Sequence, residues 1–492
     1  MPPLNTFDKT AIALLLSQAA IIPAANAATI NVGVGGAGCT LSDAIRSANQ
    51  DVAIGSCTAG TIGADTISIP SQTITYTEAA GDGYQYGNSA LPLIASEITI
   101  EGNGSTIERE VDGGATYNDF RIIATEYSNI EANLTLNSIV IANGYALYSA
   151  SIGYGYGGGV YAGADTSVTI NDSTIKDNTS PGGGGGVYGW QDSTIRINNT
   201  TISGNSAVYG GGVMGDESSD IIINESVITG NSAAYGGGLY LYVGTTMAVV
   251  NSTISNNTAL SFGGGIRAVG GNSATVRLDV IGSTISDNTV SGVTLGGHKG
   301  GGISTYQASI NITNSSISGN HANEYGSGLD INASTLVMKN TTVSNNSTVR
   351  SIDFSGNETY PTSATFLNTV VANSPGNVDC YINGAYVTLT TDTSNWIESG
   401  TCNSPSSGDP MLGPLADNGG LTYTHLPAMG SGLEGAGDLS VCGSGPVAGR
   451  DQRGELRGTD SCFIGAVEPF ADGSINFFVV PLPSGKSVIF GL

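Results

Sequence analysis

The residues with the clearest potential for acid–base chemistry lie in neighbouring turns of the chain. The stretch "GGHKGGG" contains His298 and Lys299, and His321 and Glu324 follow about one repeat unit later. A general base beside a cation that neutralises a substrate carboxylate is what a polysaccharide lyase requires. These four residues are therefore candidate catalytic residues. No paired catalytic carboxylates are apparent, and polar turn residues are usually only solvated, so we assign no reaction to them.

A second set of candidates is a row of residues at one fixed position of the repeats. Tyr161, Tyr188, Tyr240 and Arg267 each come two residues after a Gly run. These four side chains point outward if the aliphatic residue between each of them and the Gly run points inward. Outward tyrosines offer apolar faces with hydroxyls, which suits sugar rings or protein partners; the alternative is a ladder that only stabilises the stack. A similar row precedes the Gly runs, where stabilisation is the preferred interpretation: Tyr156, Tyr209, Tyr235, Phe262, Lys299 and Tyr325.

Acidic turn residues raise the question of a metal. Asp165, Asp192, Asp216 and Glu217 recur in turns that stack if the repeats coil. However, no D-x-D-x-D or G-G-x-G-x-D motif is present, and no Cys/His spacing indicates zinc. Calcium binding remains an alternative that this pattern does not decide, and we predict neither a metal nor a cofactor.

The elements that position these residues come from an internal repeat. Stretches such as "NTTISGNSAVYGGGV" and "NSTISNNTALSFGGGI" recur at intervals of 26 to 32 residues, which is typical of a solenoid. Helical repeats are disfavoured because Gly, Thr, Asn and Ser are poor helix formers and the apolar residues alternate. One unit supplies three short strands and three turns, which is one coil of a parallel β-helix. The crossover rule for parallel strands makes it right-handed.

Each recurring residue type has a structural reason in such a coil. The central Ile of "STIS" points inward, and Gly runs at 157–159, 184–186, 210–212, 236–238, 263–265 and 300–302 allow tight bends and close stacking. A recurring Asn bonds to its equivalents above and below as a ladder. The N-x-[ST] matches in the repeats are read as a consequence of this ladder rather than as glycan sites. The predicted ladder consists of Asn178, Asn205, Asn231, Asn257, Asn288, Asn320 and Asn346.

The two ends of the chain differ from the repeats. Residues 1–27 resemble an export signal, with an apolar run followed by Ala25-Asn26-Ala27. All six cysteines lie outside the repeats, in an even number that suggests disulfides in an oxidising compartment. Their locality predicts Cys39–Cys57, Cys380–Cys402 and Cys442–Cys462. "CTLSDAIRSANQ" (39–50) has the apolar spacing of a short helix that caps the first coil.

Composition restricts the partners. The 492 residues include 40 acidic and 15 basic ones, which gives a net charge of −25. Such a chain is repelled by nucleic acid and by anionic membrane surfaces. The tail 477–492 is too short and too polar to span a membrane, and its two apolar runs suggest a β-hairpin.

Two parts of the sequence resemble known families. The repeats "I-x-G-N-S-A…G-G-G-[VIL]" resemble those of chlamydial polymorphic outer membrane proteins. The stretches "DPMLGPLADNGGLTYTHLP" (409–427), "DQRGELR" (451–457) and "CFIGAVE" (462–468) look like the choice-of-anchor Q module of bacterial surface proteins. One departure is "SGLEGAG" where that family usually has a sequence like "SPAIDAG". The resemblance implies export and β-helix architecture, but no settled activity.

We therefore expect an all-β protein built around a right-handed parallel β-helix. The expected organisation is a signal peptide (1–27), an N-terminal cap (28–60), the β-helix (61–375), a choice-of-anchor Q-like module (376–470) and a tail (471–492). The expected role is adhesion or glycan binding without catalysis, in a secreted or bacterial cell-surface protein. A polysaccharide-degrading enzyme, lyase or glycoside hydrolase, is the alternative, and a structural stalk is the third interpretation.

Overall fold

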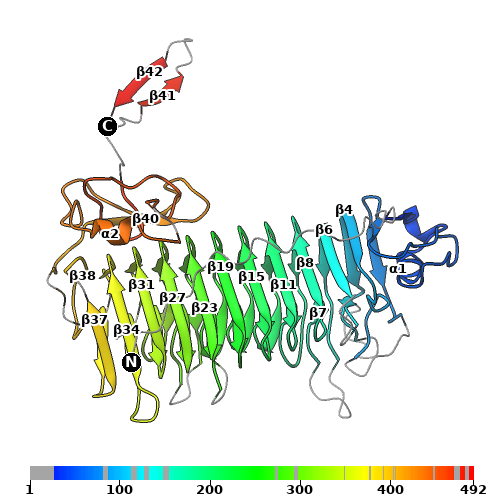
Figure 1. The fold of residues 1–492 in the computed structure, drawn as a ribbon, viewed down its shortest axis with the longest axis horizontal. Helices are drawn as coiled ribbons and strands as arrows, with labels where there is room; N and C mark the ends of the chain where they lie inside the picture. The colour runs from blue at the N-terminus through cyan, green and yellow to red at the C-terminus, as the bar shows by residue number, and fades with distance from the viewer. Residues whose placement is uncertain are drawn as a thin grey trace, which may run out of the picture.

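The computed structural model describes a right-handed parallel β-helix with a small module along its side (Figure 1). The described residues are 27–492 without 81–86, 112–118, 127–131, 148–154, 272–274, 293–296, 348, 376–377, 392, 403, 405, 447–448, 470–476, 482–486 and 492. The predicted signal peptide, apart from Ala27, lies outside them.

The largest sheet has 23 strands in two arms, which the long strands β4 and β6 join. The first arm consists of β1 (Thr29–Asn31), β2 (Asp65–Ser68), β4 (Ile98–Arg109), β6 (Asn133–Ala142), β8 (Ser167–Asn171), β11 (Thr194–Asn198), β15 (Asp220–Asn224), β19 (Thr246–Val250), β23 (Val276–Ile281), β27 (Ala308–Thr313), β31 (Thr335–Lys339), β34 (Thr362–Leu367) and β37 (Val387–Thr391). The second arm adds β3 (Thr73–Tyr76), β9 (Thr174–Lys176), β12 (Thr201–Ser203), β16 (Val227–Thr229), β20 (Thr253–Ser255), β24 (Thr284–Ser286), β28 (Ser316–Ser318), β32 (Thr342–Ser344), β35 (Val370–Ala372) and β38 (Trp396–Ile397).

Two further parallel sheets complete the coils. The ten-stranded sheet consists of β5 (Ile123–Ala124), β7 (Val160–Ala162), β10 (Val187–Gly189), β14 (Val213–Gly215), β18 (Leu239–Tyr242), β22 (Ile266–Val269), β26 (Ile303–Tyr306), β30 (Leu329–Asn332), β33 (Ile352–Ser355) and β36 (Cys380–Asn383). The five-stranded sheet consists of β13 (Ser206–Tyr209), β17 (Ser232–Tyr235), β21 (Thr258–Phe262), β25 (Thr289–Val290) and β29 (His321–Ala322).

The repeat dictates where each coil turns. Between the two arms, and again after the second arm, one residue adopts the left-handed conformation that Asn, Asp and Gly tolerate best. In the coil β11–β14 these are Asn199 (φ 45°) and Gly204 (φ 65°). The residue after each turn is buried and bonded along the axis. These two rules explain why "N-[ST]-[ST]" and "G-N" recur, and hence why N-x-[ST] matches appear at the structural period.

The buried Asn positions form a continuous hydrogen-bonded ladder. The Asn231 backbone N–H and its Nδ2 both donate to Asn257 Oδ1, at 3.0 and 2.9 Å, and Asn205 bonds in the same way to Asn231. A second ladder, which the repeat analysis did not identify, follows the other turn: the Thr200 N–H donates to Ser226 Oγ and the Ser226 N–H to Ser252 Oγ. Inside the two ladders, stacked Ile, Val and Leu side chains fill the coil.

The ends are braced as the cysteine spacing predicts. The helix α1 (Leu41–Gln50) begins at Thr40, whose side chain accepts the Asp43 N–H, and it buries Leu41, Ala44 and Ile45 against the first coil. A 3₁₀ turn, η1 (Val34–Gly36), precedes it. Disulfides join Cys39 with Cys57, Cys380 with Cys402, and Cys442 with Cys462.

The β-helix continues past the expected boundary at residue 375. Strands β36, β37 and β38 add another coil, up to Ile397, so Cys380–Cys402 braces this coil rather than the module. The Gly run is missing there, which is why the repeat pattern did not reveal it. The module contains β39 (Leu412–Ala416), β40 (Thr424–Pro427) and α2 (Leu439–Cys442), and the tail forms the antiparallel pair β41 (Phe477–Pro481) and β42 (Ser487–Gly491).

Candidate functional site

The tyrosine column has the predicted register but is not an exposed strip. Tyr161, Tyr188, Met214, Tyr240 and Arg267 lie on neighbouring strands of the ten-stranded sheet. The three tyrosines, however, are only 1, 2 and 6% exposed, so the expectation of an open binding strip is wrong. They form a second hydrophobic cluster outside the coil.

The burial of this column has an identifiable cause. Tyr156, from the turn before β7, stacks on Tyr188 at 4.6 Å between ring centroids, and Arg121 lies 4.5 Å above the Tyr161 ring. The Tyr188 hydroxyl donates to Asp216 Oδ2, and burial raises the pKa of Tyr188 well above its usual value. Asp216, one of the acidic turn residues, is thus engaged by a tyrosine.

The row before the Gly runs is the more exposed aromatic row. Tyr209, at 37% exposure, stacks on Tyr235, and Tyr235 stacks on Phe262, with interplanar angles of 14 and 12°. Because neighbouring rings cover one another's faces, mainly ring edges reach solvent. This geometry agrees with a stabilising ladder better than with a stacking platform for sugars.

The column on the ten-stranded sheet becomes charged beyond Tyr240. Arg267 Nη1 donates to Ser304 Oγ, and Ser304 Oγ donates to Asp330 Oδ2 at 2.7 Å. Asp353, directly beside Asp330 on β33, pairs with Arg350 at 2.6 Å. Burial raises the pKa of both Asp330 and Asp353, and the two carboxylates are 2 and 0% exposed. They form the carboxylate pair that the sequence did not reveal.

The four candidate catalytic residues divide between this column and the turns. Lys299 lies over the Tyr325 ring, near Asp330 and Asp353. His298 is buried, with Nδ1 3.0 Å from Leu260 O, and its backbone oxygen accepts the Glu324 N–H. His321 is held between Ser347 and Asn323. The ring of each histidine is hydrogen-bonded to a neighbouring coil, His298 to Leu260 and His321 to Ser347.

The acidic turn residues do not gather as metal ligands. Asp192 and Glu217 lie on adjacent coils, since the Asp192 N–H donates to Glu217 O, while Asp165 bonds through its N–H to Gln191 O. Within the residues that the structure describes, no three His, Cys, Asp or Glu side chains come together in a group that could hold a metal ion.

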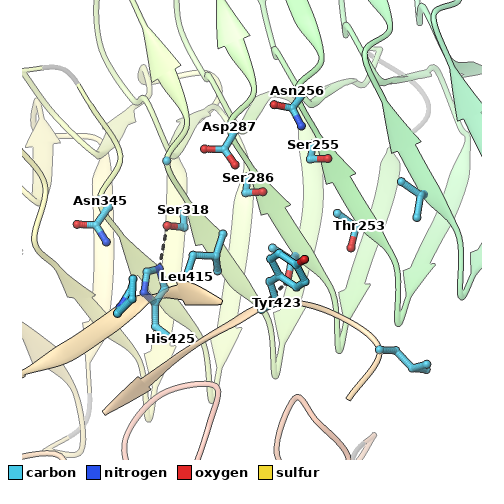
Figure 2. Close-up of a pocket in the computed structure, with 15 residues that line it drawn as sticks. Thr253, Ser255, Asn256, Ser286, Asp287, Ser318, Asn345, Leu415, Tyr423 and His425 are labelled. Carbon is cyan, nitrogen blue, oxygen red and sulfur yellow. Dashed lines mark hydrogen bonds between the residues drawn. The ribbon is translucent and has the colours of Figure 1, made fainter. Parts of the chain in front are cut away.

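An open site lies between the module and the second arm, and we call it the module groove (Figure 2). It encloses about 700 Å³. One wall consists of strands β16, β20, β24 and β28 with their turns, and the other consists of β39, β40 and the loop between them. Its lining residues are Val227, Thr253, Ser255, Asn256, Thr284, Ser286, Asp287, Ser318, Gly319, Asn345, Pro414, Leu415, Leu421, Tyr423 and His425.

The two walls of the module groove differ in chemistry. The β-helix wall has serines at the same offset on successive coils, because "[ST]-I-S" recurs with its Ile inward. These are Ser255, Ser286 and Ser318, which are 9, 4 and 2% exposed. Beside them Asn256, Asp287 and Asn345 occupy the left-handed turn position. The module wall contributes the Tyr423 ring, 56% exposed. Polar groups thus face an aromatic and apolar surface.

The module is fixed to the β-helix by buried polar contacts. His425 Nε2 lies 2.8 Å from Ser318 Oγ and its Nδ1 lies 2.7 Å from Gly413 O; burial lowers the pKa of this histidine. Gln452 of the "DQRGELR" stretch accepts from Ser316 Oγ and donates to Thr284 Oγ1. The motif residues therefore attach the module, and the sequence contained no signal for the strands they contact.

One comparison with known proteins agrees with the fold. A family model described as "Right handed beta helix region" matches residues 98–281. A search of curated proteins finds no match. Two solved structures are similar, each at 12% identity. The A-module of the mannuronan C-5 epimerase AlgE6 from Azotobacter vinelandii matches over 71% of this chain and 92% of that chain (TM-score 0.39), and the pectate lyase Pel9A over 81% and 97% (TM-score 0.40). At these scores neither likeness carries an argument about function.

The structure also bears on the membrane. Across its described part, no helix is long and apolar enough to cross a bilayer.

Proposed function

We propose that the protein is an exported, secreted or cell-surface protein that binds a glycan without catalysis, and that the module groove is its binding site. The observation that carries the proposal is that the exposed polar turn residues Asn256, Asp287 and Asn345 lie in the same groove as the partly exposed Tyr423 ring. Sugars have hydroxyl-rich edges and apolar faces, so they suit a site with one polar and one aromatic wall.

The dimensions of the groove support an extended ligand. Its volume falls within the usual range of about 300–1,000 Å³ for small-molecule sites. Equivalent positions on neighbouring coils repeat at about 4.8 Å. A sugar unit in an extended polysaccharide advances by a similar distance, so successive units can meet the polar turn residues of successive coils. The rigid sheet also reduces the ordering cost of binding.

Catalysis is the weaker interpretation. An enzyme needs acid and base groups that its substrate can reach. Asp330 and Asp353 are almost fully covered, and His425 is 1% exposed with both ring nitrogens engaged. Asp287 is the one carboxylate among the lining residues of the groove. A purely structural stalk, the third interpretation, does not account for a groove that the module leaves open beside its docking contacts.

The test is a glycan-array screen of the purified protein, with product analysis for every glycan bound. Tyr423→Ala is expected to weaken binding of the best glycan about tenfold, because it removes the aromatic wall. Tyr386→Ala is the matched control, since Tyr386 is 46% exposed in the turn between β36 and β37, away from the groove.

The outcomes separate the three roles. Binding without products, and sensitive to Tyr423 only, supports the proposal. Release of shortened or unsaturated products would establish the enzyme instead. No binding to any glycan, or equal effects of the two substitutions, would refute the module groove as a glycan site.

A further inference from the structure

Three cations gather on the face of the ten-stranded sheet, away from the residues that line the module groove. We call Arg267, Lys299 and Arg350 the cationic layer. They are three of only 15 Lys and Arg residues in a chain with 40 acidic ones. All three are partly exposed. Such a concentration of positive charge is unexpected on a protein with a net charge of −25.

Buried carboxylates beneath the layer hold two of these cations in place. Asp353 pairs directly with Arg350, and Asp330 holds Arg267 through Ser304. Because Asp330 and Asp353 are 2 and 0% exposed, their charge is covered by the layer above them. Glu324, a further acidic residue nearby, accepts the Gly297 N–H with Oε2. Arg267, Lys299 and Arg350 are thus partly exposed above the two covered aspartates, and Glu324 is a partly exposed carboxylate beside them.

Aromatic rings restrict how the cations move. The Arg350 guanidinium lies 4.1 Å from the Tyr325 centroid and 3.6 Å from that of Tyr381. Arg267 lies 4.6 Å from the Phe262 centroid, and Lys299 lies 5.6 Å from that of Tyr325. Cations held over ring faces are pre-organised, so an anion that binds them pays less in side-chain entropy.

Lys299 is near Asp330 and Asp353 but forms no direct ion pair with either. Among the described residues its ammonium makes no hydrogen bond or ion pair, and its contact is the Tyr325 ring. An ammonium has three donors, and carboxylate or sulfate oxygens are strong acceptors for them. Burial also lowers the pKa of Arg267, a cost that a bound anion would offset.

We infer that the cationic layer is a second binding site, for the carboxylate or sulfate groups of an acidic polysaccharide. The inference rests on the proposed function, because it assigns the class of glycan. The layer extends from β22 to the turn before β33, three coil steps or on the order of 14 Å along the axis. A polymer with an anionic group on successive units can engage several of these cations, whereas a single small acid cannot.

The experiment measures binding of polygalacturonate, its fully methyl-esterified form and dextran sulfate to the full chain. Lys299→Ala is expected to weaken binding of the acidic polymers about tenfold and to leave the methyl ester unaffected. Lys299→Arg is expected to retain most of the affinity. Lys339→Ala is the matched control: it removes one positive charge from the outward face of β31 on the first arm. Circular dichroism melting reports whether each variant folds.

Several results would overturn the inference. It fails if neither acidic polymer binds, if Lys299→Ala and Lys339→Ala act equally, or if monomeric galacturonate binds as tightly as the polymer. Polyglutamate binding of equal affinity and equal dependence on Lys299 would point to an acidic polypeptide instead. Tyr423→Ala separates the two sites: if it weakens neutral-glycan binding while Lys299→Ala leaves the binding of both acidic polymers unchanged, the module groove stands and the cationic layer does not.

Discussion

At the scale of single residues, the ladder asparagines connect the coils along the axis. From Asn205 onward, each one accepts two hydrogen bonds from the preceding coil and donates to it as well; Asn231 Nδ2, for example, also donates to Ile202 O. Asn231 is 1% exposed, so water cannot replace a lost partner. The short period of the ladder makes it a cooperative network rather than a set of separate bonds.

Asn231→Ala is therefore expected to be strongly destabilising. The substitution leaves the Asn205 N–H and Nδ2 without their acceptor, at about 1–3 kcal/mol for each unpaired buried group. Urea unfolding measures the change in the free energy of unfolding. The control is Asn224→Ala, which removes a partly exposed, outward Asn from the same coil. Equal destabilisation by the two substitutions would contradict the structural role of the ladder.

Only part of the tyrosine column could be predicted from the sequence. The alternation of side chains correctly placed Tyr188 and Tyr240 outside the coil, but alternation specifies only a side of the sheet. What covers that side came from Tyr156 and other residues of the preceding turns. Arg267 and Lys299 were identifiable as candidates, whereas Arg350 and Asp353 were not, because their coil has no Gly run.

At the scale of elements, the docking of the module depends on contacts that are distant in sequence. Gln452 reaches Ser316 and Thr284, which lie 136 and 168 residues away. The family-like motif indicated that a module exists, but a motif contains no information on its partner strands. Consequently the module groove, which exists only where β39 and β40 face the second arm, was not predictable from the repeats.

The docked His425 predicts that the module loosens in mild acid. Burial lowers the pKa of His425 below its usual value of about 6.5, so the folded state favours the neutral ring. A histidine whose pKa is lowered on folding contributes full stability above about pH 6.5 and loses it as pH falls toward the lower folded value. Limited proteolysis of the module between pH 7.5 and 4.5 is expected to accelerate over this window.

The role of His425 in this pH dependence can be tested by comparing substitutions of two histidines. The rate of proteolysis of the His425→Gln variant is expected to change less between pH 7.5 and 4.5, because the titrating side chain is absent. His321→Gln, in strand β29 of the five-stranded sheet, is the control and keeps the wild-type pH profile. An unchanged pH profile in His425→Gln would show that another group controls docking.

At the scale of the whole molecule, the regular part of the β-helix was predictable because successive coils use the same residue types at the same positions. Inward Ile, left-handed turn residues and buried Asn recur together, so each copy supports the interpretation of the others. The irregular parts were not: the long strands β4 and β6, the last coil from Cys380 to Ile397, and the module along the side rather than over an end. Each of these parts depends on contacts that occur only once in the molecule. Such contacts produce no repeat in the sequence from which they could be predicted.

The whole rod depends on close stacking between successive coils. The backbone of Gly237 donates to Gly263 O at 3.0 Å, and a Cβ at Gly237 would press against the carbonyl oxygens of Gly264 and Thr258 on the next coil. Backbone oxygens cannot move aside as a flexible side chain can, so Gly237→Ala forces two coils apart. We expect a loss of about 1–3 kcal/mol or more in the free energy of unfolding. Gly443→Ala is the control, since its Cβ would meet nothing closer than Leu439 O at 3.3 Å. If calorimetry gives the two variants the same melting temperature, the Gly runs serve the bends alone and close coil stacking does not require them.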